Sequence, residues 1–135
     1  MPTLLMYVDG RVLKLEGYPE ILEPVQVAAC EATAKAFNLM NGVKDVGMLG
    51  PIAFDSGVNA PNIFIRGIAS QEKSMKDPYP LIHRWESEMA EALQKLNRLD
   101  QCKDLLVAGP WRIEFQPSIA PGKWATYMLG MPPSK

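Results

Sequence analysis

Residues 62–69, with the sequence NIFIRGIA, give the clearest β-strand pattern in this chain of 135 residues. Four of these eight side chains are β-branched or aromatic, the kinds that strands favour. Turn-forming residues lie just before this strand, from Asp55 to Pro61 (DSGVNAP). A strand is therefore predicted here, and the segments on either side of it decide the fold.

The segment after this strand predicts a helix and then another strand. Beyond Asp77-Pro78, apolar side chains recur at helical spacing on one stripe: Leu81, Ile82, Trp85, Met89, Ala92, Leu93, Leu96 and Leu99. His83 falls off this stripe and is expected to be exposed. Farther on, Trp111, Ile113 and Phe115 alternate with charged residues, which is typical of a half-buried strand.

The segment before the central strand shows the same order of elements. Residues 3–8 (TLLMYV) predict a buried strand that closes at Asp9-Gly10. A helix of about four turns is expected from Tyr18-Pro19, through an entry that includes Pro24, to a stop at Asn41-Gly42. Its stripe contains the small thiol Cys30, expected to be buried, and residues 46–54 then predict an extended stretch.

Strand, helix and strand therefore occur twice, which predicts one α/β domain over residues 1–135. Residues 1–60 form the first β-α-β unit and residues 61–116 the second, giving a four-stranded core sheet with two helices on one face. Residues 117–135 form a tail that carries large apolar side chains, among them Trp124, Tyr127, Met128 and Leu129. Such side chains are costly to leave in water, so the tail is expected to pack on other protein surface.

Composition excludes several classes of function. The chain is 47% hydrophobic with a net charge of -1, which gives no support for nucleic-acid binding. No apolar run approaches the roughly 20 residues that span a bilayer, and signal-peptide features are absent, so a cytoplasmic protein is expected. Three Cys and His residues, Cys30, His83 and Cys102, are too few and too scattered for a structural zinc site, and no metal is predicted.

Two stretches resemble the tautomerase superfamily, which includes 4-oxalocrotonate tautomerase, macrophage migration inhibitory factor and cis-3-chloroacrylic acid dehalogenase. They are Pro2–Arg11 (PTLLMYVDGR), which follows Met1, and Ala60–Ser70 (APNIFIRGIAS). The resemblance implies a homotrimer, with the tail on a neighbouring subunit, that works without a cofactor. It also implies catalysis by an amino-terminal proline once Met1 is removed.

Pro2 has suitable chemistry for this role. Its nitrogen becomes a free secondary amine when Met1 is gone, and an unperturbed α-amino group has a pKa of about 8. Packing against the apolar strand disfavours the charged form and lowers this pKa. Such an amine moves a proton between carbon and oxygen without a histidine. While Met1 is attached, the nitrogen is an amide without basicity, and Pro2 is then only a rigid start to a strand.

Basic residues are needed to hold an acidic substrate. Arg66 lies within the central strand, on the same face as Phe64 and Ile68. A charge in so apolar a strand needs a partner or a cavity, so Arg66 either binds substrate or forms a buried salt bridge or a subunit contact. Arg11, in an Asp-Gly-Arg triplet, is similar to the Glu-Gly-Arg of 4-oxalocrotonate tautomerase. It comes one residue sooner after the proline, which reverses its face on a strand.

Ser70 and Lys73 occupy the region where the dehalogenase and malonate semialdehyde decarboxylase branches place arginines. A lysine does not reproduce a bidentate guanidinium clamp, so dehalogenation and decarboxylation are less favoured. Glu114 faces away from Trp111 and is expected to pair with a nearby arginine or, less readily, to act as an acid. Tyr7, Trp111, Trp124 and Tyr127 are candidates for an aromatic pocket.

The sequence thus predicts a keto-enol tautomerase or isomerase acting on a small acidic carbonyl or enol substrate. Pro2 is the predicted catalyst, and Arg66, Arg11, Lys73 and Ser70 are the predicted substrate-binding residues. The alternative is a non-catalytic trimeric scaffold or ligand-binding protein of the same fold.

Overall fold

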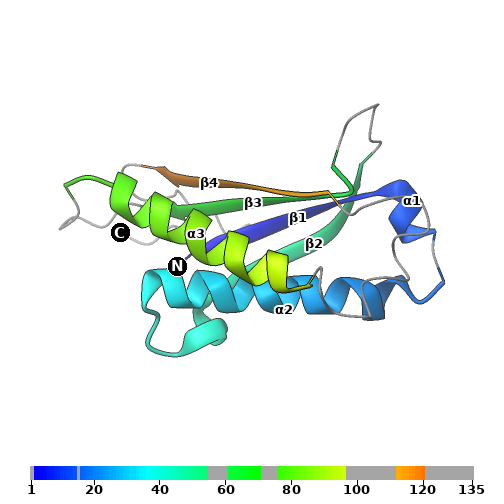
Figure 1. Cartoon of the computed structure of the whole chain (residues 1–135), viewed down its shortest axis with the longest axis horizontal. Helices are drawn as coiled ribbons and strands as arrows, with labels where there is room; N and C mark the ends of the chain where they lie inside the picture. Colours follow the sequence, from blue (N-terminus) through cyan, green and yellow to red (C-terminus); the bar gives the residue numbers. More distant parts are fainter. Residues whose placement is uncertain (1, 15, 55–60, 71–75, 97–111, 121–135) are drawn as a thin grey trace, which may run out of the picture.

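The computed structural model describes residues 2–14, 16–54, 61–70, 76–96 and 112–120. A four-stranded sheet has the strand order β2-β1-β3-β4, and Figure 1 shows two long helices, α2 and α3, packed on one of its faces. The elements in chain order are β1 (Thr3–Asp9), α1 (Gly10–Leu13), α2 (Tyr18–Phe37), the 3-10 turn η1 (Gly42–Asp45), β2 (Gly47–Phe54), β3 (Ile63–Ser70), α3 (Tyr79–Leu96) and β4 (Ile113–Ala120).

The sheet consists of two pairs of parallel strands, and the two pairs are joined by an antiparallel contact between their inner strands. β1 is parallel to β2, and β3 is parallel to β4, so each pair with its helix forms a β-α-β unit. The units meet where β1 runs antiparallel to β3, with Thr3 opposite Ile68 and Val8 opposite Ile63. This arrangement confirms the predicted fold of two β-α-β units with both helices on one face of a four-stranded sheet.

The core lies between the sheet and the two helices. Alternate side chains of the central strands, Leu4, Met6 and Val8 on β1 and Ile63 and Ile65 on β3, are fully buried. Ala69 of β3 is buried on the same side, and the side chains at the alternate positions face the side of the sheet that carries no helix among the described residues, as the period of two requires. The open face carries the polar and charged side chains Thr3, Arg66 and Ser70 of these two strands.

Trp85 of α3 is the largest side chain of the core and is fully buried. Its ring makes edge contacts with Phe37 of α2 at 4.8 Å and Phe115 of β4 at 5.4 Å, between ring centroids. The ring lies directly over Gly67 of β3, where a Cβ atom would be 2.5 Å from the Trp85 ring. The absence of a side chain at this position therefore lets α3 approach the sheet.

Several boundaries differ from the prediction. The Asp9-Gly10 turn opens into α1, because the Asp9 carboxylate accepts a hydrogen bond from the Arg11 backbone N–H at 2.9 Å and caps a short helix. α2 has 20 residues rather than about four turns, contains Pro24, and ends at Asn38, whose left-handed φ of 51° stops it before the expected Asn41-Gly42. Cys30 is half-buried rather than buried.

The predicted tail also begins too early. β4 continues to Ala120, so residues 117–120 pair with β3 of the same chain. Residues 121–135, and Leu99 and Trp111 among the predicted apolar positions, lie outside the described residues. Within the described part of the chain, none of the helices has the length and apolar character that crossing a membrane requires.

Candidate functional site

Pro2 stands directly before β1 and is buried. Its carbonyl accepts a hydrogen bond from the Gly47 N–H at 3.0 Å, which ties it to the first residue of β2. The alternation of β1 carries Pro2 to the same side as Leu4 and Met6, the helix side. The pyrrolidine ring is thus held at one end of the sheet, the end at which Figure 1 marks the N-terminus.

Arg66 lies in the middle of β3 on the open face and is exposed. It is opposite Leu5 on β1 and beside Gln116 on β4. Leu5 is three residues from Pro2, about 10 Å along the strand, and the two point to opposite faces. Within one chain, the structure therefore does not bring Arg66 and Pro2 together.

A groove of about 480 Å³ surrounds Arg66 on the open face. Tyr7 and Phe64 form part of its wall, with ring centroids 6.1 Å apart, and the two residues are partners across β1 and β3. The full lining consists of Tyr7, Phe54, Pro61, Phe64, Arg66, Glu114 and Gln116. Of the predicted aromatic pocket, Tyr7 is confirmed in a groove, while Trp111, Trp124 and Tyr127 lie outside the described residues.

Glu114 lines this groove and binds an arginine, as expected. Arg112 donates a hydrogen bond from Nη2 to Glu114 Oε1 at 2.6 Å, and both side chains are partly exposed. Among the described residues, Arg66 makes no ion pair or hydrogen bond with its side chain, so its guanidinium remains available to a ligand. The groove lining therefore carries one guanidinium group, that of Arg66, and one carboxylate, that of Glu114, which is paired with Arg112.

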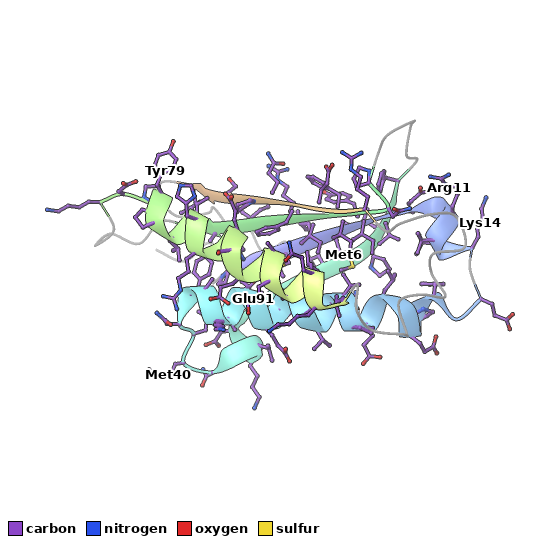
Figure 2. All side chains as sticks on the ribbon, viewed as in Figure 1. Met6, Arg11, Lys14, Met40, Tyr79 and Glu91 are labelled. Atoms are coloured by element: carbon purple, nitrogen blue, oxygen red, sulfur yellow. The ribbon has the colours of Figure 1, made fainter. Side chains whose placement is uncertain are left out.

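Arg11 lies at the other end of the molecule. Asp9 is seven positions after Pro2, about 23 Å along the strand, and Figure 2 shows Arg11 on the α1 side, far from the N-terminal end. Its Nε and Nη2 donate to Asp9 Oδ2 at 3.0 and 2.7 Å. This hydrogen bond, followed by the charge of the nearly buried Asp9 carboxylate, raises the pKa of Arg11 above its ordinary value.

Ser70 is the predicted binding residue that the fold brings to the Pro2 end. β3 runs antiparallel to β1 and continues two residues past Ile68, the partner of Thr3, so it ends beside the start of β1. Ser70 lies on the open face and Pro2 on the helix side. Lys73 lies outside the described residues.

Gln116, Phe54 and Pro61 are groove residues that sequence reasoning missed. Gln116 follows the alternation of residues 113–116 that the sequence shows, and pairing the two predicted strands in parallel would have placed it beside Arg66. No local sequence pattern places Phe54 and Pro61 in this groove, because their positions depend on how the strands β2 and β3 are arranged in the sheet. Among the residues that the structure describes, no three His, Cys, Asp or Glu side chains come together as a metal site.

No protein-family model and no curated protein matches this chain in sequence. Solved structures do match it in three dimensions. A malonate semialdehyde decarboxylase, studied as wild type, with its first residue, a proline, replaced by alanine, and in an inactivated form, has a TM-score of 0.57. It is 11% identical in sequence, and the match covers 96% of this chain and 91% of that one.

Two further structures match at lower TM-scores. Macrophage migration inhibitory factor from Toxoplasma gondii has a TM-score of 0.49 and 10% identity, over 92% of this chain and 95% of that one. A fused 4-OT, solved as an asymmetric trimer, has a TM-score of 0.44 and 16% identity, over 88% and 86% of the two chains. The decarboxylase match and the duplicated β-α-β topology together show that the chain shares the fold of that malonate semialdehyde decarboxylase.

Proposed function

We propose that this protein is a keto-enol tautomerase or isomerase that uses the free amine of Pro2 as its acid-base catalyst. The observation that carries the proposal is the position of Pro2. It is a buried proline at the start of a central strand, held through its carbonyl by Gly47 at 3.0 Å. A secondary amine in a fixed position can take a proton from carbon and return it to oxygen, as the reaction requires.

Two features support this assignment over one based on other side chains. His83, the sole histidine of the sequence, is exposed on α3, where it stacks on Tyr79 with ring centroids 6.3 Å apart. The similar decarboxylase was studied with its own first-position proline replaced by alanine. This chain would share that first-position proline once Met1 is removed, and the common fold then favours a common use of the proline nitrogen.

The substrate we propose is a small acidic carbonyl or enol compound. Ser70 ends β3 at the same end of the sheet as Pro2, with its hydroxyl donor on the open face, and Lys73 follows it in the sequence by three residues. Arg66 and Arg11 are about 10 Å and 23 Å away along the strands. These two arginines can serve Pro2 only from a neighbouring subunit, and we propose a homotrimer in which this occurs.

The open face of the sheet supports an assembly. Leu49 and Ile52 of the edge strand β2 are exposed by 56% and 38%, and both stand next to half-buried residues of β1. Covering such side chains on a second copy removes apolar surface from water. Light scattering should give a mass near three chains at micromolar concentration, and a mass near 15.0 kDa would contradict the assembly.

The catalytic proposal is tested with two proteins and one assay. Intact-mass spectrometry first establishes that Met1 has been removed, and the chain is then assayed with phenylpyruvate enol and with 2-hydroxymuconate. Pro2→Ala should lower the rate on the accepted substrate by about 10²–10⁴-fold, the usual effect of losing a positioned proton carrier. Its melting temperature should stay near that of the wild type, since a proline at a strand start donates no ladder hydrogen bond.

A non-catalytic trimeric scaffold or ligand-binding protein is the second candidate, favoured by the separation of Arg66 and Arg11 from Pro2 within one chain. Retention of Met1 on most molecules, or full activity of Pro2→Ala, would favour this candidate. Loss of the fold or of the oligomer in Pro2→Ala would show that the residue is structural.

A further inference from the structure

We propose that the groove between α3 and β4 binds a small amine with an aromatic body. The groove has a volume of about 330 Å³, at the small end of the range of ligand pockets. It lies on the helix side of the sheet, opposite to the face that carries Arg66 and that the proposed homotrimer uses. This proposal does not rest on the assignment of Pro2 as a catalyst.

β4 supplies one apolar wall of this groove. Phe115 lies beside Ile65 of β3, which is fully buried on the helix side, and Ile113 shares this face because it is two residues away. The Phe115 ring is held by its edge contact with Trp85, with ring centroids 5.4 Å apart. Ile113 and Phe115 are only half-buried, so the fixed wall leaves apolar surface against which a ligand ring packs.

α3 supplies the floor and the opposite wall. Met89 is fully buried at the floor, and Leu93 is half-buried one turn farther along the helix. The thioether of a methionine makes favourable contacts with aromatic rings. Glu86 and Ala90 are exposed at the rim, on the same helical face as Leu93. From Glu86 to Leu93 the helix rises about 10 Å, which accommodates one ring and a short arm that ends in an amine.

Glu86 is the carboxylate of α3 that has no ion pair within the described residues. Glu88 is paired with Lys35 at 3.4 Å. Glu91 is paired with Lys95 at 3.3 Å, and both pairs line the groove between α2 and α3, on the other side of the helix. A carboxylate only accepts hydrogen bonds, so Glu86 favours a ligand that carries donors and a positive charge.

The charge of the helix layer acts in the same direction. α2 and α3 together contain six glutamates and only three lysines or arginines. Arg112, just before Ile113 in the sequence, is paired with Glu114 at 2.6 Å on the open face. The helix side of the molecule therefore attracts an ammonium group and repels a carboxylate.

The test uses 2-(4-fluorophenyl)ethylamine as the probe, with its binding to the full chain followed by ¹⁹F NMR at pH 7, where a primary amine is charged. 2-(4-Fluorophenyl)ethanol, which has no charge, and 4-fluorophenylacetate, which has the opposite charge, are the ligand controls. The amine should bind about two- to fivefold more tightly than the alcohol, as expected for a partly exposed ion pair, and the acid should bind most weakly. Added salt should weaken the binding of the amine and not that of the alcohol. Equal binding of the three compounds, or no binding of the amine, would overturn the proposal.

Charge variants identify the carboxylate that the amine contacts. Glu86→Gln should remove the advantage of the amine over the alcohol. Glu31→Gln is the matched control, because it removes an exposed carboxylate from the groove between α2 and α3, and it should bind the amine as the wild type does. An equal loss in the two variants would show only a general attraction to the helix layer and would contradict the proposed site.

Two further variants locate the probe in the molecule. Ala90→Leu fills the groove from an exposed position and should abolish the binding of the amine and of the alcohol. Its melting temperature should stay near that of the wild type, since leucine is a good helix former. Pro2→Ala should leave the affinity for the amine unchanged. Unchanged binding in Ala90→Leu, or loss of binding in Pro2→Ala, would place the probe elsewhere and overturn the proposal.

Discussion

The indole nitrogen of Trp85 donates a hydrogen bond to Thr33 Oγ1 across 2.9 Å, and both side chains are fully buried. The same hydroxyl donates to the Ala29 carbonyl of its own helix at 2.8 Å. The residues are 52 positions apart in sequence, so this bond joins the helix of the first β-α-β unit to the helix of the second. One polar contact in an apolar core thereby sets how α2 and α3 face each other.

Thr33→Val removes the acceptor of this bond while nearly preserving the side-chain volume. The Trp85 N–H is then buried without a partner, and the variant should lose about 1–3 kcal/mol of unfolding free energy. Urea denaturation followed by tryptophan fluorescence measures the loss. Thr33→Ser keeps the hydroxyl and should lose less. Equal stability of Thr33→Val and the wild type would show that the hydrogen bond makes no net contribution.

Gly67→Ala tests the close approach of α3 to the sheet. The new Cβ would lie 2.5 Å from the Trp85 ring and 3.0 Å from the Phe115 ring, so the helix or the rings must shift. Overpacking of this kind costs about 1–3 kcal/mol. Thermal unfolding of Gly67→Ala should show the loss.

Gly10→Ala is the matched control for this variant, because the nearest atom to its Cβ is the Phe54 carbonyl oxygen at 4.0 Å. It should unfold near the wild-type temperature. Trp85→Phe, which shortens the ring system, should reduce the penalty of Gly67→Ala in a double-mutant cycle. Additive losses in that cycle would contradict the contact.

Cys30 provides a pH-dependent prediction. Its partial burial, and secondarily the negative charge of Glu31, raise the pKa of the thiol above its ordinary value. In a Cys102→Ser background, iodoacetamide should therefore alkylate the folded chain more slowly at pH 8 than the urea-unfolded chain. The folded thiol holds its proton more tightly than the unfolded one. Its contribution to stability is therefore complete below the unfolded pKa and is lost as pH rises through the folded pKa.

The fold was predictable because its main signals are local. The alternation in β1 and β3 and the apolar stripe of α3 each specify an element and the face that it buries. The end of α2 was misplaced for a physical reason. Asn38 takes a left-handed conformation that asparagine tolerates, and Arg84 of α3 donates to the Lys35 carbonyl at 3.1 Å and to Asn38 Oδ1 at 3.0 Å. No pattern within α2 alone reveals that tertiary cap.

The candidate site was predictable only in part, because the pairing of neighbouring strands decides which side chains lie next to a charged residue. The face of Arg66 follows from its distance to Phe64 and Ile68 along one strand. Its neighbour Gln116 follows only from the parallel pairing of β3 with β4, which is a non-local choice. The ion pair of Arg11 with Asp9 depends on α1, a single turn too short to leave a periodic signal.

Selective acylation of the terminal amine gives the last prediction. An α-amine is less basic than a lysine side chain, with an ordinary pKa of about 8 against about 10.4, so cyanate near pH 7 modifies the terminus first. Carbamylation of Pro2 turns its nitrogen into a non-basic urea, and activity should fall in proportion to the modified fraction seen by intact-mass spectrometry. A form of the chain with one residue left in front of Pro2 is the control. Its proline nitrogen is already an amide, so it should be inactive before treatment.

The pH dependence of the rate tests the same amine. Since a general base works in its neutral form, kcat/KM of the untreated enzyme should decline as pH falls through the amine pKa, and Pro2→Ala should shift the pH at which this decline occurs. Full activity after complete carbamylation would exclude the amine as the catalyst while leaving the fold and the Arg66 groove untouched.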